Sequence, residues 1–375
     1  MREVVVTGIG LVSCAGEGVD AHLAALAAGA PPPTDAETFA PFPVHPVVVP
    51  NYDNQIPKKS DQRQMEPWQR LGTYAAGLAL DAAGAKEDAA LKSRMHLVVA
   101  AGGGERDYAV DGQILTGLRR AADPGVFLNE RLMGDLRPTL FLAQLSNLLA
   151  GNIAIVHGVT GASRTFMGEE SSGVDAIRIA QARIASGQNE IFLVGSAYNA
   201  ERPDVLLIYE MGGFLWHGSY RPVFERASDG GGTILGSGAC FLVLESRTHA
   251  AARGATPLAA VTAVASDRHR RQPGSVEAAV ADLARRVGGN PDLVVSGATG
   301  VQGITGEERD ALAGLAAEAR VVASGDIVGH TMEAQAPFGV ALAAAAIARG
   351  QARDALVTSV GHWRGEGAIR VAAAS

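Results

Sequence analysis

One acidic side chain, Glu170, occupies a position at which proteins commonly carry out chemistry. It lies within residues 161–187, GASRTFMGEESSGVDAIRIAQARIASG, where a short predicted strand is followed by a turn of small residues and then by a helix. The first turn of a helix offers unpaired backbone N–H groups and the positive end of the helix dipole. That environment stabilises a carboxylate, a thiolate or a bound anion. We therefore place the functional centre of the chain at the start of this helix.

The helix that begins beside Glu170 is predicted to lie on the protein core. Apolar residues recur at helical spacing from Val174 to Ile184, and charged or amide side chains fill the positions between them. This amphipathic pattern buries one face of a helix and leaves the other in solvent. Gly187 is predicted to end the helix. The strand and the helix would thus hold Glu170 at their junction.

The same segment carries a resemblance to a known family. Residues 168–177, GEESSGVDAI, resemble the T-A-C-[ST]-S-G motif through which the β-ketoacyl-acyl-carrier-protein synthases, or ketosynthases, enter their nucleophile helix. On this match Ser172 and Gly173 correspond to the S-G of the motif. Glu170 corresponds to the catalytic cysteine, so the resemblance implies that the nucleophile is missing.

Other segments extend the resemblance over nearly the whole chain. Residues 4–13, VVVTGIGLVS, are similar to the opening strand of the family, and residues 59–65 to its segment before the first long helix. Arg221-Pro222, residues 236–239 and residues 242–245 are similar to its R-P, G-[DE]-G-A and L-V-L-E motifs. Gly329-His330 matches the G-H of its second histidine motif. In this order and spacing the segments identify the chain as ketosynthase-like.

The chemistry of this family requires residues that the chain only partly has. Decarboxylative Claisen condensation needs a thiolate to hold the acyl chain and hydrogen-bond donors to hold the malonyl carbonyl as an enolate forms. The resemblance assigns the cysteine, two histidines and lysine of the family to Glu170, Thr299, His330 and Gly325. The phenylalanine gate loop G-F-G-G-T-N-G corresponds to residues 361–367, GHWRGEG. Three of the four catalytic positions and the gate have therefore changed.

A carboxylate cannot replace a thiolate as an acyl carrier, because the mixed anhydride that it would form hydrolyses readily. Loss of one imidazole also removes a donor of a kind whose deletion costs about 10²-fold or more in rate. The vestigial catalytic positions are then Glu170, Thr299 and His330. Three interpretations of Glu170 remain: a carboxylate stabilised by the helix terminus, a residue that fills the nucleophile site and pairs with His330, and a general base.

The resemblance points to one class within the family. Chain-length-factor subunits lack the nucleophile and form a heterodimer with a cysteine-bearing ketosynthase, whose acyl tunnel they shape. In the family, residues just before the nucleophile strand reach across the dimer, and residues 137–141 occupy that place here. The resemblance therefore implies that Leu140 lines the acyl tunnel of the partner. His362 and Trp363 would fill the former gate and contact substrate.

Two other functions fit the same residues. One is an active homodimeric β-ketoacyl synthase or malonyl decarboxylase that uses Glu170 and His330. The other is a module that binds an acyl carrier protein without chemistry. All three functions imply an acyl carrier protein as partner. The pathway, fatty-acid or polyketide, is not specified by these residues.

Charge and composition exclude one class of partner and describe a globular chain. The 375 residues are 47% hydrophobic, and 32 basic against 39 acidic residues give a formal net charge of −7. A nucleic-acid-binding protein needs a dominant basic face, so we expect none here. The basic clusters at residues 58–59, 119–120 and 268–271 are either solvated or dock an acidic carrier protein.

Neither metal nor cofactor is predicted. Cys14 and Cys240 are too few for a zinc site or a disulfide framework, and their apolar neighbours predict buried free thiols. The histidines have no ligand spacing such as H-x-x-x-H. Residues 102–104, three glycines, lack the Lys-Ser/Thr of a phosphate loop, so close backbone packing is the better interpretation.

The opening sequence MREVVVTGIG has a short apolar run that ends in glycines, with no basic leader and no cleavage site. It predicts a strand and not a signal peptide. No run approaches the about 18 uncharged apolar residues of a membrane span. We therefore expect a soluble cytoplasmic protein that does not bind membranes.

Two repeated patterns predict an internally duplicated α/β fold. The strand, glycine turn and helix of residues 4–28 return at residues 292–319, and the strand at residues 190–195 returns at 355–361. The resemblance implies the thiolase fold, two βαβαβαββ halves in five α-β-α-β-α layers. We expect the halves at residues 1–250 and 251–375. Helices are predicted at residues 65–84 and 138–151.

Overall fold

The computed structural model describes residues 1–135, 142 and 144–375. Its strands form a first sheet section of β1 (Val4–Ser13), β4 (His96–Ala101), β5 (Ser163–Met167), β6 (Ile191–Tyr198) and β8 (Gly238–Ser246). Their spatial order is β5-β4-β6-β8-β1. Strand β4 is parallel to both β5 and β6, whereas β8 is antiparallel to β6 and β1. The apolar runs of β1, β6 and β8 suit strands buried on both faces.

A second sheet section repeats this arrangement. It consists of β9 (Ala259–Asp267), β10 (Leu293–Ser296), β11 (Arg320–Ala323), β12 (Asp354–Val360) and β13 (Glu366–Ala372), in the order β11-β10-β12-β13-β9. The strand directions also repeat, with β10 parallel to β11 and β12, and β13 antiparallel to β12 and β9. A short antiparallel pairing of β1 with β9 joins the two sections. The predicted duplication is thereby confirmed.

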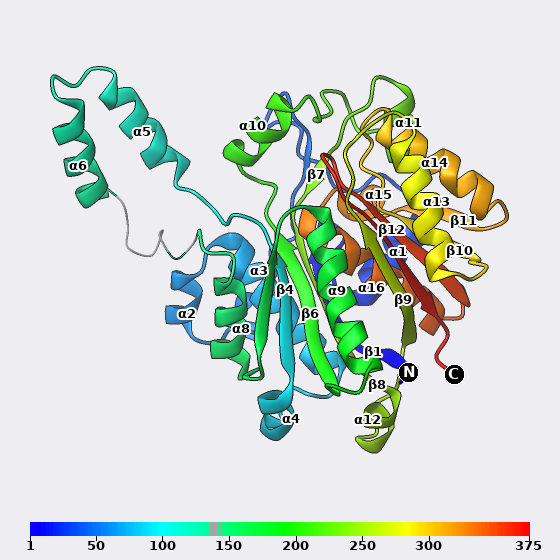
Figure 1. Ribbon diagram of the computed structural model, residues 1–375. Coiled ribbons are helices and arrows are strands. Elements are labelled where there is room, and N and C mark those ends of the chain that lie inside the picture. The colour runs from blue at the N-terminus through cyan, green and yellow to red at the C-terminus, as the bar shows by residue number, and fades with distance from the viewer. Residues whose placement is uncertain (136–141, 143) are drawn as a thin grey trace.

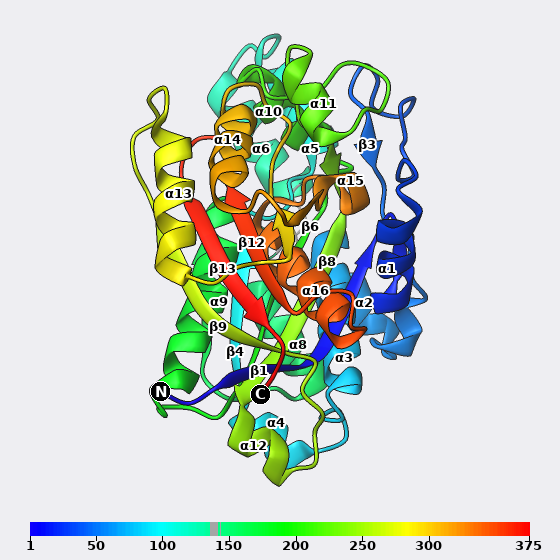
Figure 2. The ribbon, with the colours of Figure 1, turned by 90° about the vertical axis from the view of Figure 1, so that its right-hand side faces the viewer.

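Helices complete the five layers, as Figures 1 and 2 show. Helices α9 (Glu170–Ala185) and α16 (Gln335–Ala348) lie between the sheet sections and contact strands of both. Helices α3 (Pro67–Ala82) and α8 (Leu148–His157) cover the outer face of the first section, and α13 (Ser275–Val287) covers that of the second, with α14 (Ile304–Leu315) against it. The sequence QAPFGVALAAAAI explains the central place of α16, because every one of these side chains is buried.

The remaining elements connect these layers. A two-stranded parallel sheet joins β3 (Val44–His45) to β7 (Leu235–Gly236). Figure 1 shows α5 (Tyr108–Leu118) and α6 (Pro124–Asp135) extending away from the layered body. The connecting elements are β2 (Gly16–Glu17), α1 (Gly18–Ala28), β3 (Val44–His45), η1 (Tyr52–Asn54), α2 (Lys59–Gln64), α4 (Ala89–Arg94), α5 (Tyr108–Leu118), α6 (Pro124–Asp135), α10 (Pro203–Met211), α11 (Val223–Ser228), β7 (Leu235–Gly236), α12 (Arg247–Ala252), α15 (Gly325–Val328) and η2 (Met332–Ala334).

Two details of the sequence prediction were wrong. In the two sheet sections, β1 occupies the place of β9, and β4 occupies the place of β10. The predicted repeat of residues 4–28 at residues 292–319 therefore paired β1 with β10, which are not equivalent strands. A strand, a glycine turn and a helix recur at several junctions of a layered α/β fold, which makes that pattern unspecific. The helix predicted at residues 138–151 begins only at Leu148, since residues 144–147 are not helical, and it continues to His157, because the left-handed residue that ends it is Gly158, with φ of 74°. Part of its predicted span, residues 138–141 and 143, lies outside the described residues.

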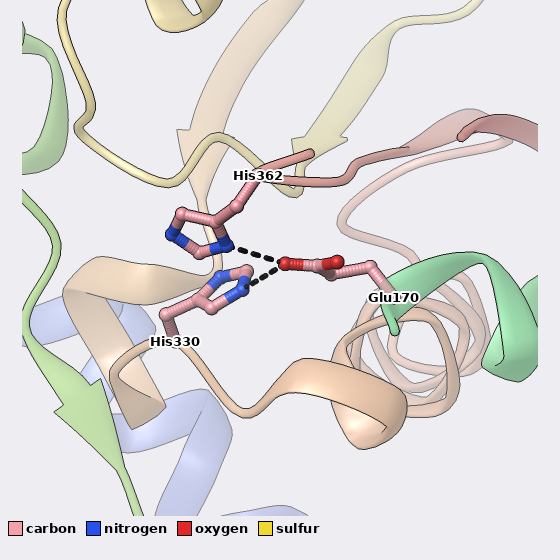
Figure 3. Close-up of side chains that lie close together, drawn as sticks. All are labelled: Glu170, His330 and His362. Carbon is pink, nitrogen blue, oxygen red and sulfur yellow. Dashed lines mark hydrogen bonds and ion pairs between the residues drawn. The ribbon is translucent and has the colours of Figure 1, made fainter. Parts of the chain in front are cut away.

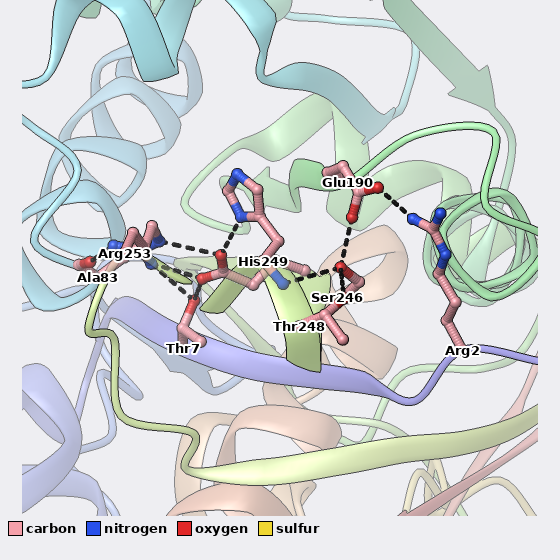
Figure 4. A network of polar contacts seen from close by, with 9 residues as sticks. Arg2, Thr7, Ala83, Glu190, Ser246, Thr248, His249 and Arg253 are labelled. Atoms are coloured by element: carbon pink, nitrogen blue, oxygen red, sulfur yellow. Dashed lines mark hydrogen bonds and ion pairs between the residues drawn. The ribbon is translucent and has the colours of Figure 1, made fainter. Parts of the chain in front are cut away.

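A buried ion-pair network ties the N-terminal strand to the end of β8 (Figure 4). The side chain of Glu245 is fully buried and accepts hydrogen bonds from Thr7, from His249 Nδ1 at 2.7 Å and from Arg253 Nε at 2.9 Å. Arg253 also donates to the carbonyl oxygen of Ala83, just after α3, at 2.7 Å. Glu245, the acid of the L-V-L-E motif, therefore joins β1, β8, α12 and α3.

Both cysteines are free and buried, as predicted. Burial raises the pKa of the Cys14 thiol to about 12 and also raises that of Cys240. In the part of the chain that the structure describes, none of the helices has the length and apolar character needed to cross a bilayer.

Candidate active site

Glu170 begins helix α9, as the sequence predicted. Strand β5 ends at Met167, and Gly168, with φ of 141°, turns the backbone toward the helix. Glu170 lies in the first helical turn, where the dipole favours a carboxylate, and its side chain has no exposed surface. The carboxylate therefore points into the protein, between the two sheet sections.

Two histidines reach Glu170 from the second half of the chain. His330 lies just before η2, and its backbone is fixed by hydrogen bonds with Ile234 and Gly236. His362 lies in the turn between β12 and β13, which is closed by a 2.9 Å hydrogen bond from Gly361 N–H to the carbonyl oxygen of Gly365. Both side chains are buried, at 1% and 3% exposure.

Figure 3 shows both imidazoles directed at one carboxylate oxygen. His330 Nε2 lies 2.8 Å and His362 Nδ1 lies 2.6 Å from Glu170 Oε1. The two rings are nearly perpendicular, with centroids 4.7 Å apart. We call these three residues the Glu170 cluster. A carboxylate accepts several hydrogen bonds, so both rings can donate to Oε1 at once.

The electrostatics of the Glu170 cluster favour an ionised carboxylate. Burial raises the pKa of Glu170, but the charge and hydrogen bonds of His362 and His330 outweigh it and hold the pKa well below its ordinary value. Burial lowers the pKa of His330 despite its bond to Glu170. Glu170 Oε2, His330 Nδ1 and His362 Nε2 are buried and have no hydrogen-bond partner among the described residues.

The resemblance also assigned catalytic positions to Thr299 and Gly325. Thr299 is buried in the turn after β10, where its hydroxyl accepts a 3.2 Å hydrogen bond from Val301 N–H. Gly325 begins α15, and a Cβ added there would meet Val223 at 3.0 Å. The structure thus brings together Glu170, His330 and His362, while Thr299 bonds within its own turn. Leu140 lies outside the described residues.

Aromatic side chains enclose the outer side of His362. Its ring lies 5.2 Å from the rings of both Tyr209 and Phe214, measured between centroids. Trp363 packs on the same two rings at 5.3 Å and 5.1 Å, and it is 38% exposed. Helix α10 and the residues after it therefore hold the turn of residues 361–365 against the cluster.

A cavity of about 180 Å³ lies beside this aromatic wall. Glu333, which sequence reasoning missed, is buried in its lining, and burial together with Glu170 and Glu169 raises its pKa to about 8. A Cβ on Gly102 would meet Glu333 Oε1 at 2.7 Å, so the first glycine of residues 102–104 leaves room for this carboxyl. The available signal was a single acid three residues after His330, shortly before the apolar run of residues 336–348.

Of the basic clusters, residues 268–271 turn partly inward. Arg268 lies 3.1 Å from the Ser171 hydroxyl at the start of α9. Arg271 pairs with the buried carboxylate of Glu366 and donates to the Gly361 carbonyl oxygen at 2.5 Å. Arg119 and Arg120, after α5, are exposed.

Comparison with known sequences finds one family match and several curated relatives. The family described as "Beta-ketoacyl synthase, N-terminal domain" matches residues 1–250. The "3-oxoacyl-[acyl-carrier-protein] synthase 2" of Vibrio cholerae is 28% identical over 263 residues, which are 68% of this chain and 60% of that protein. The protein of the same name from Rhizobium meliloti is 28% identical over 279 residues, 68% of this chain and 62% of that protein. The chain thus spans about 60% of the length of these curated relatives.

Solved structures share the whole fold. "The ishigamide ketosynthase/chain length factor" aligns over all of both chains with a TM-score of 0.82 and 23% identity. A beta-ketoacyl synthase from Burkholderia phymatum aligns equally completely, with a TM-score of 0.82 and 19% identity. A ketosynthase in the AntDE:AntF complex with an acyl carrier protein gives a TM-score of 0.77 at 17% identity. These matches confirm the thiolase fold.

Proposed function

The chain belongs to the β-ketoacyl synthase family, and we propose that it is a non-catalytic, chain-length-factor-like subunit of acyl-chain elongation on an acyl carrier protein. In this role it pairs with a cysteine-bearing ketosynthase, which performs the condensation. The carrier protein delivers the acyl and malonyl groups to the pair. The partner ketosynthase determines whether the acyl chain becomes a fatty acid or a polyketide.

The Glu170 cluster is the observation that carries this proposal. Condensation requires a thiolate and imidazole donors that face the malonyl carbonyl. At this place the chain has a carboxylate, and Nε2 of His330 is already engaged by Glu170 Oε1 at 2.8 Å. The two thiols of the chain are buried elsewhere, with raised pKa values. A site of this composition can neither store an acyl chain nor stabilise the enolate in the manner of the family.

The free edge of β5 supports pairing with a second subunit. Strand β5 pairs with β4 on one side only, and it has no partner strand on the other among the described residues. Met167 at its end is 65% exposed, and Ile155 on the neighbouring α8 is 75% exposed. Exposed sheet edges with apolar side chains are normally covered in native proteins. A ketosynthase partner that covers this edge would satisfy both features.

Docking of an acidic carrier protein is assigned to Arg119 and Arg120 in preference to residues 268–271. Arg119 and Arg120 are exposed, as are Arg268 and Arg270, whereas Arg271 is partly buried. Arg271 is committed to Glu366, and Arg268 to Ser171 and Asp175. Long-range attraction between opposite charges would raise the rate of carrier binding.

Reconstitution tests the proposal. The chain is purified alone and after co-expression with a cysteine-bearing ketosynthase from the same organism, and both samples receive acyl- and malonyl-loaded carrier protein. We expect the two chains to copurify and β-ketoacyl product to form only in the pair. Malonyl decarboxylation or condensation by the isolated chain would support the active-enzyme alternative instead. Carrier binding without copurification would support the binding-module alternative.

A further inference from the structure

The carboxylate of Glu170 is a buried anion whose ion-pair partners are two titratable groups. Its side chain is fully buried, and among the described residues it forms ion pairs with His330 and His362 but with no lysine or arginine. An uncompensated charge in a protein interior is costly, so some cation must balance it. The balancing cation is either a proton on one imidazole or a metal ion.

The ligand types and their placement suit a transition metal. Two imidazole nitrogens with one carboxylate form a known ligand set for zinc and for non-haem iron, with further coordination positions open. One ligand atom from each of Glu170, His330 and His362 can be chosen so that all three lie within 4.8 Å of one another. Glu170 lies at the start of α9, His330 two residues before η2, and His362 in the turn after β12, so three separate segments converge.

The present distances require only a small adjustment for a metal. Glu170 Oε1 lies 2.8 Å from His330 Nε2 and 2.6 Å from His362 Nδ1. Neighbouring ligands around a tetrahedral metal with bonds of about 2.1 Å lie roughly 3.4 Å apart. Each imidazole nitrogen would therefore move away from Oε1 by roughly 0.6–0.8 Å. Glu170 Oε2, which has no partner among the described residues, can provide a second carboxylate contact.

Each imidazole has an inner nitrogen that faces Glu170 and an outer nitrogen that faces away from it. The inner nitrogen can bind a metal when the proton of the neutral ring is on the outer one. His330 Nδ1 and His362 Nε2 have no hydrogen-bond partner in the described part of the chain, so no outside contact fixes either tautomer. Each neutral ring can carry its proton on the outer nitrogen.

We propose that Glu170, His330 and His362 bind one divalent transition-metal ion, with Zn²⁺ as the first candidate. The ligands are the Glu170 carboxylate, His330 Nε2 and His362 Nδ1. On binding, each imidazole coordinates as the neutral ring, so a proton on its inner nitrogen moves to the outer nitrogen, and the extra proton of an imidazolium is released to solvent. The cavity of about 180 Å³ is lined by Tyr209 and Trp363, whose rings lie 5.2 Å and 6.0 Å from the ring of His362. Metal binding is independent of the proposed pairing, since all three ligands belong to this chain.

Metal analysis of the purified chain tests this site. The chain is stripped with a chelator, dialysed against micromolar Zn²⁺ and measured for bound metal. We expect one equivalent per chain. Loss of a residue that only hydrogen-bonds to a metal ligand lowers metal affinity about 10–100-fold. Loss of a ligand itself should lower the Zn²⁺ affinity by at least that factor, as tested with Glu170→Gln, His330→Gln and His362→Gln. His157→Gln is the matched control, because His157 is also buried but bonds to the Thr73 carbonyl oxygen at 2.8 Å, outside the cluster.

A second measurement avoids variants that fail to fold. Co²⁺ replaces Zn²⁺ in the wild-type chain, and its visible absorption reports nitrogen and oxygen ligands in a site of low coordination number. We expect a saturable absorption at one equivalent that excess Zn²⁺ abolishes. Absence of stoichiometric Zn²⁺ and Co²⁺ binding would overturn the site and leave the cluster balanced by a proton. Binding that survives all three ligand substitutions would overturn it as well.

Discussion

The resemblance assigns Glu170 to the position of the reactive thiol of the family, and two separate parts of the chain stabilise its carboxylate. The helix dipole stabilises its charge from α9, and two imidazoles bind it from the second half of the chain. A glutamate at this position differs from a cysteine by more than the absence of sulfur. Its carboxylate also engages His330, the histidine that the resemblance assigns to the active site. Restoring sulfur alone should not restore the chemistry.

We expect Glu170→Cys to remain inactive in condensation. Thr299 still lacks an imidazole, and loss of one such donor costs about 10²-fold or more in rate. The measurement is β-ketoacyl product formed by the purified variant from acyl- and malonyl-loaded carrier protein, with a cysteine-bearing ketosynthase as the positive control. Full condensation by this single variant would refute the assignment of Thr299.

Glu333 should make the chain less stable as the pH rises. Its folded-state pKa of about 8 lies above the ordinary value of 4.5, so the folded state binds the proton more tightly than the unfolded state does. The stabilisation is complete below about pH 4.5 and is lost as the pH rises through about 8. Glu169, Glu170 and Tyr198 are the titratable groups that face it.

The Glu333→Gln variant tests this pH dependence. Its free energy of unfolding in urea, measured at pH 5, 6.5 and 8, should fall less over this range than that of the wild type. The difference should reach a few kcal/mol, since each unit of pKa shift corresponds to about 1.4 kcal/mol. Glu277→Gln, an exposed acid on α13, is the control and should keep the wild-type slope. Equal slopes for both variants would contradict a protonated Glu333.

At the scale of elements, the sequence indicated two of the three residues of the Glu170 cluster. The strand, turn and helix around Glu170 were predictable because Gly168 and the amphipathic helix are local signals. His330 followed from the G-H match. The contact of His362 was not predictable, since it lies 192 residues from Glu170 and depends on how the turn between β12 and β13 folds over α9. The same separation explains why no ligand spacing indicated a metal.

The turn of residues 361–365 should be sensitive at Gly365. Its φ of 88° favours glycine, and an added Cβ would lie 2.8 Å from the Cβ of Ser171 in α9. Gly365→Ala should therefore cost more than the about 1–2 kcal/mol of a left-handed residue alone. Gly350→Ala is the matched control, with φ of 69° and open space around the added methyl group. Thermal and urea unfolding measure both variants, and equal losses would contradict the close packing of the turn on α9.

At the scale of the whole molecule, the duplication was predictable but its register was not. The repeat at β6 and β12 was correct, whereas β1 was matched to the wrong strand, because short apolar strands look alike in sequence. The division at residue 250 and the pairing with a second subunit stay predictions. The five layers followed from the resemblance, which rests on motifs spread along the chain.

The network around Glu245 should contribute strongly to the stability of the whole chain. Removal of Arg253 leaves a fully buried carboxylate without its main partner, and breaking such a pair costs about 3–5 kcal/mol. Arg253→Ala should show this loss in urea unfolding. Arg285→Ala removes an exposed arginine that lies 3.8 Å from Asp282, and it should cost at most about 1 kcal/mol. Similar losses for the two variants would contradict a structural role of the network.

Intact-protein mass spectrometry of the isolated chain tests the central claim most directly. The chain is incubated with acyl- and malonyl-loaded carrier protein, and its mass and the carrier-bound products are measured together. The account predicts no acyl adduct on this chain and no β-ketoacyl carrier protein. An acyl adduct on this chain accompanied by β-ketoacyl product would contradict it.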